Sequence, residues 1–478
     1  MVNWFSTINL LSQEVTPMTA NDKLKTLQQQ RIAHHRQQTD AYDFFNLLTS
    51  DQLLSVIESL LPDHRERLYP PTETLAMFLA QVMNADSSCQ RAVNDMAIKR
   101  MLNGLPRVTT DTGVYCKARQ RLPLHMLSHL TQYTGQWVAQ HASPAWSWQG
   151  RKMKLVDGTT ITMPDTPANQ AQYPQQVTQQ PGLGFPIARV VGVICLATGT
   201  LLNAAIGAYQ GKGKSEHSLF RRLLDSFEAE DILIADRYYC SYFMIAALMA
   251  KGVDVVFQQH ATRRTDFRCG EQLGTRDHRV YWHKPKKKPD WMSSHDYEQC
   301  PDQIQLREVK VKDKIIVSTL RSPKVISKKQ LSELYQQRWH IELDLRHIKS
   351  TLGMERLSCK TPLMNEKQMW VYFLAYNLIR LIMAQSALQA DKLPRQISFK
   401  HALQIWTLWN ASTAFSMNNE QHLLTVTALI AEQTVGHRSG RVEPRAVKRR
   451  PKLFPLLMKP RSQAQEEIRK HGHPKKIK

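Results

Sequence analysis

Cysteine is scarce in this chain and forms no pattern that builds a covalent or metal-bound fold. The seven cysteines are odd in number and never occur as C-x-x-C, so neither a disulfide framework nor a zinc finger fits them. No apolar run reaches about 18 residues, because Asn377 and Arg380 interrupt the richest stretch, and a membrane span is therefore not expected. The amino terminus also lacks a secretory signal. These absences predict a soluble protein of the cytoplasm.

Acidic residues are in deficit. The 478 residues include 64 Lys and Arg but 41 Asp and Glu, which gives a formal net charge of +23. Such an excess indicates a polyanionic partner, nucleic acid first, and hence association with the nucleoid. Residues 436–478 alone hold 14 basic and 3 acidic side chains, a composition typical of a DNA-binding tail and equally of a solvated, disordered end.

The chain is too long for one ordinary domain. We expect a mobile arm over 1–45 and a helical DNA-binding domain over 46–150. Within that domain a short helix, preceded by Thr and Asp capping residues, carries Lys117, Arg119 and Arg121. A basic helix of this kind suits insertion into a DNA groove. The alternative, an ordinary solvated helix face, is equally compatible with the pattern.

Near residue 150 the pattern changes from helical to β. Three strand-like segments precede a helix, a short apolar strand, a second helix and another strand, all within 151–260. This β-β-β-α-β-α-β order, with a long helix still to come, is that of the ribonuclease-H-like fold. We therefore expect an α/β protein in which 151–260 is the first part of a catalytic domain.

The remaining segments complete this organisation. Residues 261–326 are polar and then strand-like, which predicts a mostly β insertion. A capping box at Ser327 begins a long helix, and 327–385 forms the second part of the catalytic domain. Residues 386–435 are predicted to be a carboxy-terminal helical region, and 436–478 the basic tail.

Two acids stand in surroundings that are unusual for surface residues. Asp157 lies in the middle of a predicted strand, and Asp236 ends a short apolar strand. A desolvated carboxylate requires a cation, since burying an unpaired charge costs several kcal/mol. The implied strand order makes these strands neighbours, and two close carboxylates repel unless a divalent ion lies between them. Salt bridges to local arginines are the simpler alternative.

A third acid comes from the long helix. Tyr335, Arg338, Glu342 and Lys349 are spaced so that an uninterrupted helix places all four on one face. A face that combines an acid, two cations and a phenol suits a metal and phosphate site. It is also compatible with a surface ion pair between Arg338 and Glu342.

This face matches the Y-R-E-K signature, and the chain resembles bacterial insertion-sequence transposases with an Asp-Asp-Glu triad. In particular it resembles the cut-and-paste branch with a β-rich insertion before the Glu helix. Asp157–Thr160 (D-G-T-T) is similar to that family's first-Asp motif and Asp236–Tyr239 (D-R-Y-Y) to its second. Tyr376–Arg380 resembles the helix that follows the catalytic Glu. These motifs span residues 150–385 in the expected order.

The resemblance implies a function and a cofactor. The protein would bind the terminal inverted repeats of its element, cleave DNA and join the freed 3′-OH ends to target DNA. Asp157, Asp236 and Glu342 would be catalytic and would hold two Mg²⁺ ions, with Mn²⁺ as a substitute, for in-line phosphoryl transfer.

The resemblance also implies DNA contacts. Arg338 and Lys349 would neutralise DNA phosphates, and Tyr335 would donate to a backbone oxygen. Members of this branch free their element through a hairpin and stabilise a flipped base on an aromatic residue of the insertion. Trp291 is the first choice for that residue and Trp282 the second, although either could be a core tryptophan. A homodimer in the synaptic complex is also expected.

Two other functions remain open at this stage. A ribonuclease-H-like nuclease or junction resolvase would also have an acidic site, but it would not need the Y-R-E-K face or the insertion. A non-catalytic DNA-binding regulator of transposition would keep the fold without activity. The presence of all three acids favours the transposase.

Overall fold

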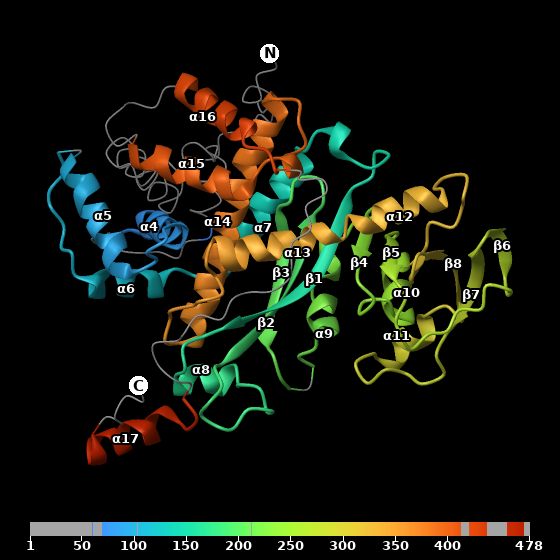
Figure 1. Ribbon diagram of the computed structural model, residues 1–478, viewed down its shortest axis with the longest axis horizontal. Helices are drawn as coiled ribbons and strands as arrows, with labels where there is room; N and C mark the ends of the chain where they lie inside the picture. The colour runs from blue at the N-terminus through green and yellow to red at the C-terminus, as the bar shows by residue number, and fades with distance from the viewer. Residues whose placement is uncertain are drawn as a thin grey trace, which may run out of the picture.

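The computed structural model describes most of the chain beyond the amino-terminal region: residues 60, 69–102, 104–211, 213–412, 420–436 and 457–472. The predicted arm, the beginning of the helical domain and much of the basic tail lie outside these residues. The rest is a mixed α/β structure with a large mixed sheet (Figure 1).

Helices occupy the region before the sheet: α4 (Pro71–Met83), α5 (Cys89–Leu102), α6 (Thr112–Arg121) and α7 (Leu124–Gln140). Proline in the first turn fits the start of α4, where its missing N–H leaves no hydrogen bond unmade. The Asp111 side chain accepts from Gly113 N and caps α6. Helices α4, α5 and α6 pack together at one end of the molecule, at the left in Figure 1.

One sheet contains all nine strands that the described residues form, in the order β3-β2-β1-β4-β5-β9-β8-β7-β6. The strands are β1 (Met153–Thr162), β2 (Ile187–Cys195), β3 (Leu201–Ala208), β4 (Ile232–Ala235), β5 (Asp254–Gln258), β6 (Glu271–Gly274), β7 (Asp277–His283), β8 (Gln303–Val311) and β9 (Lys314–Ser318). Strands β1 to β5 follow the predicted β-β-β-α-β-α-β order, except that the short helix α8 (Pro167–Gln172) lies between β1 and β2.

The pairing explains how the parts of the chain join. Strand β2 is antiparallel to β1 and β3, and the turn between β2 and β3 contains Gly199 at φ +79°, a backbone conformation that favours glycine. Strand β4 is parallel to β1 and β5. Strand β9 pairs antiparallel with β5. The strands of the predicted insertion therefore extend the same sheet.

The other helices cover the sheet or follow it along the chain. They are α8 (Pro167–Gln172), α9 (Glu216–Arg221), α10 (Tyr242–Ala250), α11 (Ser294–Gln299), α12 (Lys328–Gln336), α13 (Trp339–Arg346), α14 (Pro362–Gln389), α15 (Phe399–Ser412), α16 (Glu420–Glu432) and α17 (Arg461–His471). Helix α14 is long and apolar enough to span a membrane, but 89% of its most apolar window is buried inside the protein. Packing in the core accounts for that apolar composition.

The two faces of the sheet have separate cores. Leu155 of β1 packs in a core with Ile341 of α13 and Ile379 of α14. Val156, the next residue of β1, packs in a second core with Phe220 of α9 and Ile245 of α10. This alternation along β1 decides which side chains can meet on each face.

Candidate active site

Asp157 and Asp236 lie side by side at the carboxyl end of β4. Leu155 of β1 is paired with Ile234 of β4 in parallel register. Each aspartate follows two residues later, which places both beyond that pair on the face covered by α13. The structure therefore brings together the two acids that the sequence singled out.

Asp157 is incompletely neutralised. Burial raises its pKa to about 6, the Asp236 and Glu216 charges contribute, and the Gly158 N–H and Arg338 act in the opposite direction. The Gly158 N–H donates to Asp157 Oδ1 at 2.8 Å. Arg338 Nη1 is 3.8 Å from Asp157 Oδ2, which is a long ion pair. A carboxylate with a raised pKa and a distant counter-charge favours a further cation nearby.

Arg338 joins the Glu helix to this pair. It lies between α12 and α13, and its Nη2 is 2.5 Å from Glu342 Oε1 while Nη1 faces Asp157. The capping box that begins α12 is present, with reciprocal hydrogen bonds between Ser327 and Gln330. One guanidinium thus contacts two of the three predicted catalytic acids.

The long helix is not a uniform α-helix, which differs from the expectation. Gln337 and Arg338 lie between α12 and α13, where bonds such as Ile341 N to Arg338 O are of the i to i−3 kind. A π-helical turn then spans His347–Thr351. A tighter turn and a π-helical turn both change the rotation per residue. The expectation that Lys349 shares one face with Glu342 assumed an uninterrupted α-helix, so it does not determine the direction of Lys349.

Tyr335 and Lys349 therefore differ in their relation to the acids. Tyr335 is buried, its hydroxyl donates to Gln258 Oε1 at 3.1 Å, and burial raises its pKa to about 12. Its hydroxyl is close enough to Arg338 and Asp236 to sense their charges. Lys349 is partly exposed, and within the described ranges it forms no ion pair with the acids.

The two tryptophans considered for a flipped base are in different environments. Trp291 is 46% exposed, with the Arg221 guanidinium 4.1 Å from its ring centre and Phe243 against its edge. Trp282 is buried, and its indole N–H donates to Glu308 Oε1 at 2.7 Å. Trp282 is therefore a core tryptophan, the alternative considered for both residues, whereas Trp291 is partly accessible to solvent.

The basic helix α6 requires one correction. Lys117 and Arg121 are exposed, but Arg119 is only 6% exposed. Its guanidinium lies over the rings of Phe78 and Tyr115, at 4.8 and 5.1 Å. Arg119 faces the helical core because α6 packs against α4, so the expected contact between Arg119 and DNA is wrong for this conformation.

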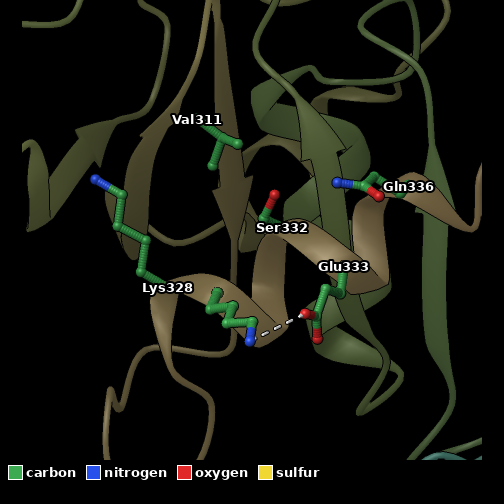
Figure 2. A pocket seen from close by; sticks show the side chains of 6 residues that line it. Val311, Lys328, Ser332, Glu333 and Gln336 are labelled. Atoms are coloured by element: carbon green, nitrogen blue, oxygen red, sulfur yellow. Dashed lines mark ion pairs between the residues drawn. The ribbon is translucent and has the colours of Figure 1, made fainter.

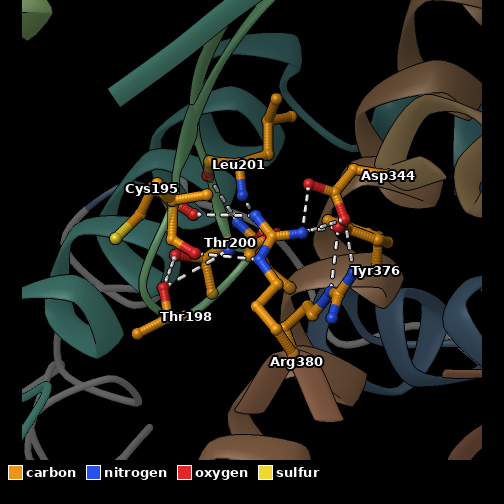
Figure 3. A network of polar contacts seen from close by, with 11 residues as sticks. Cys195, Thr198, Thr200, Leu201, Asp344, Tyr376 and Arg380 are labelled. Carbon is orange, nitrogen blue, oxygen red and sulfur yellow. Dashed lines mark hydrogen bonds and ion pairs between the residues drawn. The ribbon is translucent and has the colours of Figure 1, made fainter. Parts of the chain in front are cut away.

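Sequence reasoning missed a second charged cluster, on α13 and α14. Asp344 is fully buried and accepts from Arg380 and, at 2.7 Å, from Arg395 (Figure 3). Burial alone would raise the pKa of Asp344, but the two arginines lower it below the usual value. The available signal was Arg380 itself, because an arginine inside an apolar run needs a buried acid.

This cluster also holds the turn between β2 and β3. Arg380 Nε donates to the Tyr376 hydroxyl, which donates to Gly199 O at 2.7 Å. The Asn377 side chain bonds both backbone groups of Leu201 at 2.8 Å. The segment Tyr376–Arg380 therefore fixes α14 to the sheet that carries Asp157.

A shallow groove runs beside α12, outside the acidic site. Figure 2 shows its lining side chains, with the Lys329–Glu333 ion pair at 4.0 Å. The lining residues are Val311, Lys328, Lys329, Ser332, Glu333 and Gln336. None of them belongs to the predicted triad.

The donor chemistry of the three acids fits a divalent cation. Carboxylate oxygens are the ligands that Mg²⁺ prefers, and a cation would favour the charged form of Asp157, whose pKa burial raises. In the described part of the chain, however, no three Asp, Glu, His or Cys side chains are grouped closely enough to hold a metal. Arg338 contacts both Asp157 and Glu342 in this arrangement.

Comparison with known proteins decides the family. Residues 148–378, which contain all three acids, match the family model described as the transposase DDE domain. This segment is a transposase DDE domain, and the comparisons support an insertion-sequence transposase. The chain is also 27% identical over 356 residues to the transposase InsG for insertion sequence element IS4 of Escherichia coli (strain K12), covering 72% of this chain and 78% of that protein.

A structural similarity accompanies these matches. The piggyBac transposase synaptic complex with hairpin DNA aligns with this chain at a TM-score of 0.42 and 10% identity, covering 85% of this chain and 87% of that one. That similarity is too weak to support an argument about fold or function.

Proposed function

We propose that this protein binds the terminal inverted repeats of its insertion sequence, cleaves the DNA at the element ends and joins the 3′-OH ends to target DNA. The observation that carries the proposal is the meeting of β1, the end of β4 and the Glu helix, where Arg338 contacts Asp157 and Glu342 beside Asp236. The family match and the excess of basic residues support it.

The architecture that we propose is a ribonuclease-H-like catalytic domain in two parts, 151–260 and 327–385, separated by the β-rich insertion 261–326. The order and directions of β1 to β5 support this division. The helices before residue 150 form the DNA-binding domain, and 386–435 is the carboxy-terminal helical region.

Asp157, Asp236 and Glu342 are the proposed catalytic residues and metal ligands. They would hold two Mg²⁺ ions, or Mn²⁺ in their place. Bound ions of this kind make a water or a 3′-hydroxyl nucleophilic and stabilise the leaving oxygen. The Gly158 N–H holds one oxygen of Asp157 in place, and Arg338 supplies positive charge next to Glu342.

The DNA contacts follow from exposure and charge. Arg338 and Lys349 bind phosphates beside the acids, and Tyr335 donates to a backbone oxygen after exchanging its bond to Gln258. Trp291 stacks on the base flipped from a hairpin intermediate. Lys117 and Arg121, with other exposed basic residues, contact the terminal repeat, and two copies of the chain assemble in the synaptic complex.

The triad is tested with end-labelled element DNA, Mg²⁺ and a supercoiled target. Asp157→Asn, Asp236→Asn and Glu342→Gln should each reduce nicking to background while end binding in a gel shift remains, because they remove charge without changing shape. Asp225→Asn, at a side chain that is 98% exposed, is the matched control. Nicking by Asp236→Asn at the wild-type rate would refute the assignment.

The same assay separates the alternatives. A ribonuclease-H-like nuclease or resolvase would give wild-type nicks but no hairpin and no joined product. A non-catalytic regulator would bind the ends and give no nick.

A further inference from the structure

Aromatic and basic side chains follow one face of α9, near the end of β4. His217 and Arg221 are four residues apart in α9, so they lie on the same face of the helix. The centre of the His217 ring is 4.5 Å from that of Tyr238, and the Arg221 guanidinium is 4.1 Å from the centre of the Trp291 ring. We call these four residues the α9 strip. It joins Tyr238, shortly after β4, to Trp291 of the insertion.

The two ends of the α9 strip are exposed aromatic rings. Tyr238 is 39% exposed and Trp291 is 46% exposed. The buried ring of Tyr239 lies perpendicular to that of Tyr238, and Phe243 packs against the edge of Trp291. Each ring therefore has a fixed aromatic neighbour and a part that faces solvent. Rings placed in this way suit stacking with another planar group.

The charge of the α9 strip is positive. Arg221 Nη2 donates to Ser218 Oγ at 3.0 Å, and among the described residues no carboxylate forms an ion pair with Arg221. Arg237, next to Tyr238, is exposed. An arginine that has no acid and lies over an aromatic ring favours a partner with both negative charge and flat rings. Nucleic acid has that chemistry, and the net charge of +23 agrees with it.

The strip begins beside the candidate active site. The Tyr238 N–H donates to Asp236 Oδ1 at 2.8 Å, so the backbone that presents the Tyr238 ring also holds this carboxylate. The ring itself lies against α9 rather than among the acids. The bases of a duplex are stacked on one another, whereas unpaired nucleotides can stack on aromatic side chains. The strip therefore fits an unpaired strand better than a duplex.

We propose that the α9 strip binds an unpaired DNA strand next to the cleavage site, with Tyr238 as a second stacking residue besides Trp291 and with Arg221 positioning the Trp291 ring. The inference rests on the proposed function, in which one base leaves the duplex and stacks on Trp291. If these contacts only fixed α9 and the insertion in place, replacing the residues would change stability and leave the affinity for unpaired DNA unaltered.

The test measures binding of the full chain to a fluorescein-labelled oligothymidine strand by fluorescence anisotropy. EDTA is present, so that neither metal binding nor cleavage contributes. Tyr238→Ala should bind the strand about 5- to 150-fold more weakly than wild type, because the stacking of one base is lost. Tyr238→Phe keeps the ring and should bind as wild type. Tyr281→Ala, at a tyrosine of β7 that is 53% exposed, is the matched control and should also bind as wild type.

Two further measurements separate stacking from charge and from misfolding. A duplex of the same length presents no free base faces, so Tyr238→Ala should bind it as tightly as wild type does. Photocrosslinking of a strand that contains 5-iodouracil, mapped by mass spectrometry, needs no variant. Adducts are expected on Tyr238 and on Trp291.

The positioning role of Arg221 is tested in a double-mutant cycle with Trp291. Arg221→Ala should weaken binding of the strand when Trp291 is present. It should have no further effect in the Trp291→Ala background, because Arg221 acts through that ring. An equal loss in both backgrounds would show that Arg221 acts by charge alone and would overturn this part of the inference.

The results can contradict the inference without touching the proposed function. If Tyr238→Ala has the thermal midpoint of wild type and binds the strand equally well, and no adduct forms on Tyr238, the strip does not bind unpaired DNA. An equal loss of strand and duplex binding would also overturn it, because stacking would not be the cause. The nicking assay with the triad variants decides the proposed function separately: if those variants nick as wild type while Tyr238→Ala loses only the unpaired strand, that function fails and the strip remains.

Discussion

Two arginine–carboxylate clusters start from α13, only two residues apart, and they differ in how completely the acid is neutralised. Asp344 is fully buried between Arg380 and Arg395, which lower its pKa. Glu342, whose side chain is 35% exposed, pairs with one arginine, Arg338. The same guanidinium also faces Asp157, at the longer distance of 3.8 Å. The first cluster has two cations for one acid, and the second has one cation for two acids with Asp236 beside them.

The difference separates a structural role from a chemical one. Arg380 and Arg395 satisfy Asp344 and connect it to Tyr376 and to backbone carbonyls of the β2–β3 turn (Figure 3), so no charge is left for a ligand. The side chains of the cluster around Arg338 are only partly buried, and one guanidinium serves both Asp157 and Glu342. Only there can a phosphate or a metal ion replace an existing contact at low cost.

The largest expected effect comes from breaking the buried cluster. Asp344→Asn leaves two guanidinium groups without a counter-charge, and we expect unfolding to become easier by about 3–5 kcal/mol. Urea unfolding of the purified protein measures this loss. The exposed pair Lys251–Asp225 offers the control Asp225→Asn, which should leave the midpoint almost unchanged. Equal midpoints for both variants would show that burial does not distinguish the two kinds of pair.

The opposite pattern is expected at Arg338. Arg338→Ala should cost about 1.5–3 kcal/mol in the steps that depend on a phosphate contact, hairpin formation and strand transfer, while first-strand nicking stays measurable. Mn²⁺ affinity without DNA should rise, because the guanidinium competes for Asp157 and Glu342. Nick, hairpin and joined products are resolved and compared with those of Lys251→Ala, at the surface pair with Asp225, to check the first part. Uniform loss of all products would contradict it.

The features that the sequence could predict are those that depend on neighbouring residues along the chain. Local signals predicted the order of the strands and of the helices after β3 along the chain from β1 to β5, and the capping box of α12. Asp157 and Asp236 were recognised because the first lies within a predicted strand and the second ends an apolar one, and the pairing of β1 with β4 then brings them together.

Features that depend on distant packing were not predictable. Arg119 is buried because α6 packs on α4, which no local spacing reveals. Asp344 and Arg380 are 36 positions apart, so their pairing needs the packing of α14. Glu216 meets β1 only because Gly158 has no side chain, and that coincidence is visible in three dimensions alone.

A third arginine–acid pair, between α4 and α5, gives an effect that depends on pH and separates burial from neutralisation. Glu73 is buried, but its ion-pair partner among the described residues, Arg100, is 3.8 Å from Oε1, and that oxygen accepts no hydrogen bond from them. Burial raises the pKa of Glu73 to about 7 in spite of Arg100. Glu73 therefore combines the burial of Asp344 with a counter-charge as distant as that of Asp157.

The sign of its pH dependence follows from the raised pKa. A folded pKa of about 7 against an ordinary value of 4.5 means that the stabilising proton is fully bound below pH 4.5 and is lost as the pH rises through 7. Glu73→Gln cannot titrate, so it should match wild type near pH 4.5 and be more stable at pH 8, by up to about 3 kcal/mol, since each unit of pKa difference corresponds to about 1.4 kcal/mol. Thermal unfolding at both pH values measures the difference, with Glu333→Gln, at an exposed i,i+4 pair, as control. A Glu73→Gln variant that is less stable than wild type at pH 8 would mean that Arg100 neutralises Glu73 fully, as the two arginines neutralise Asp344.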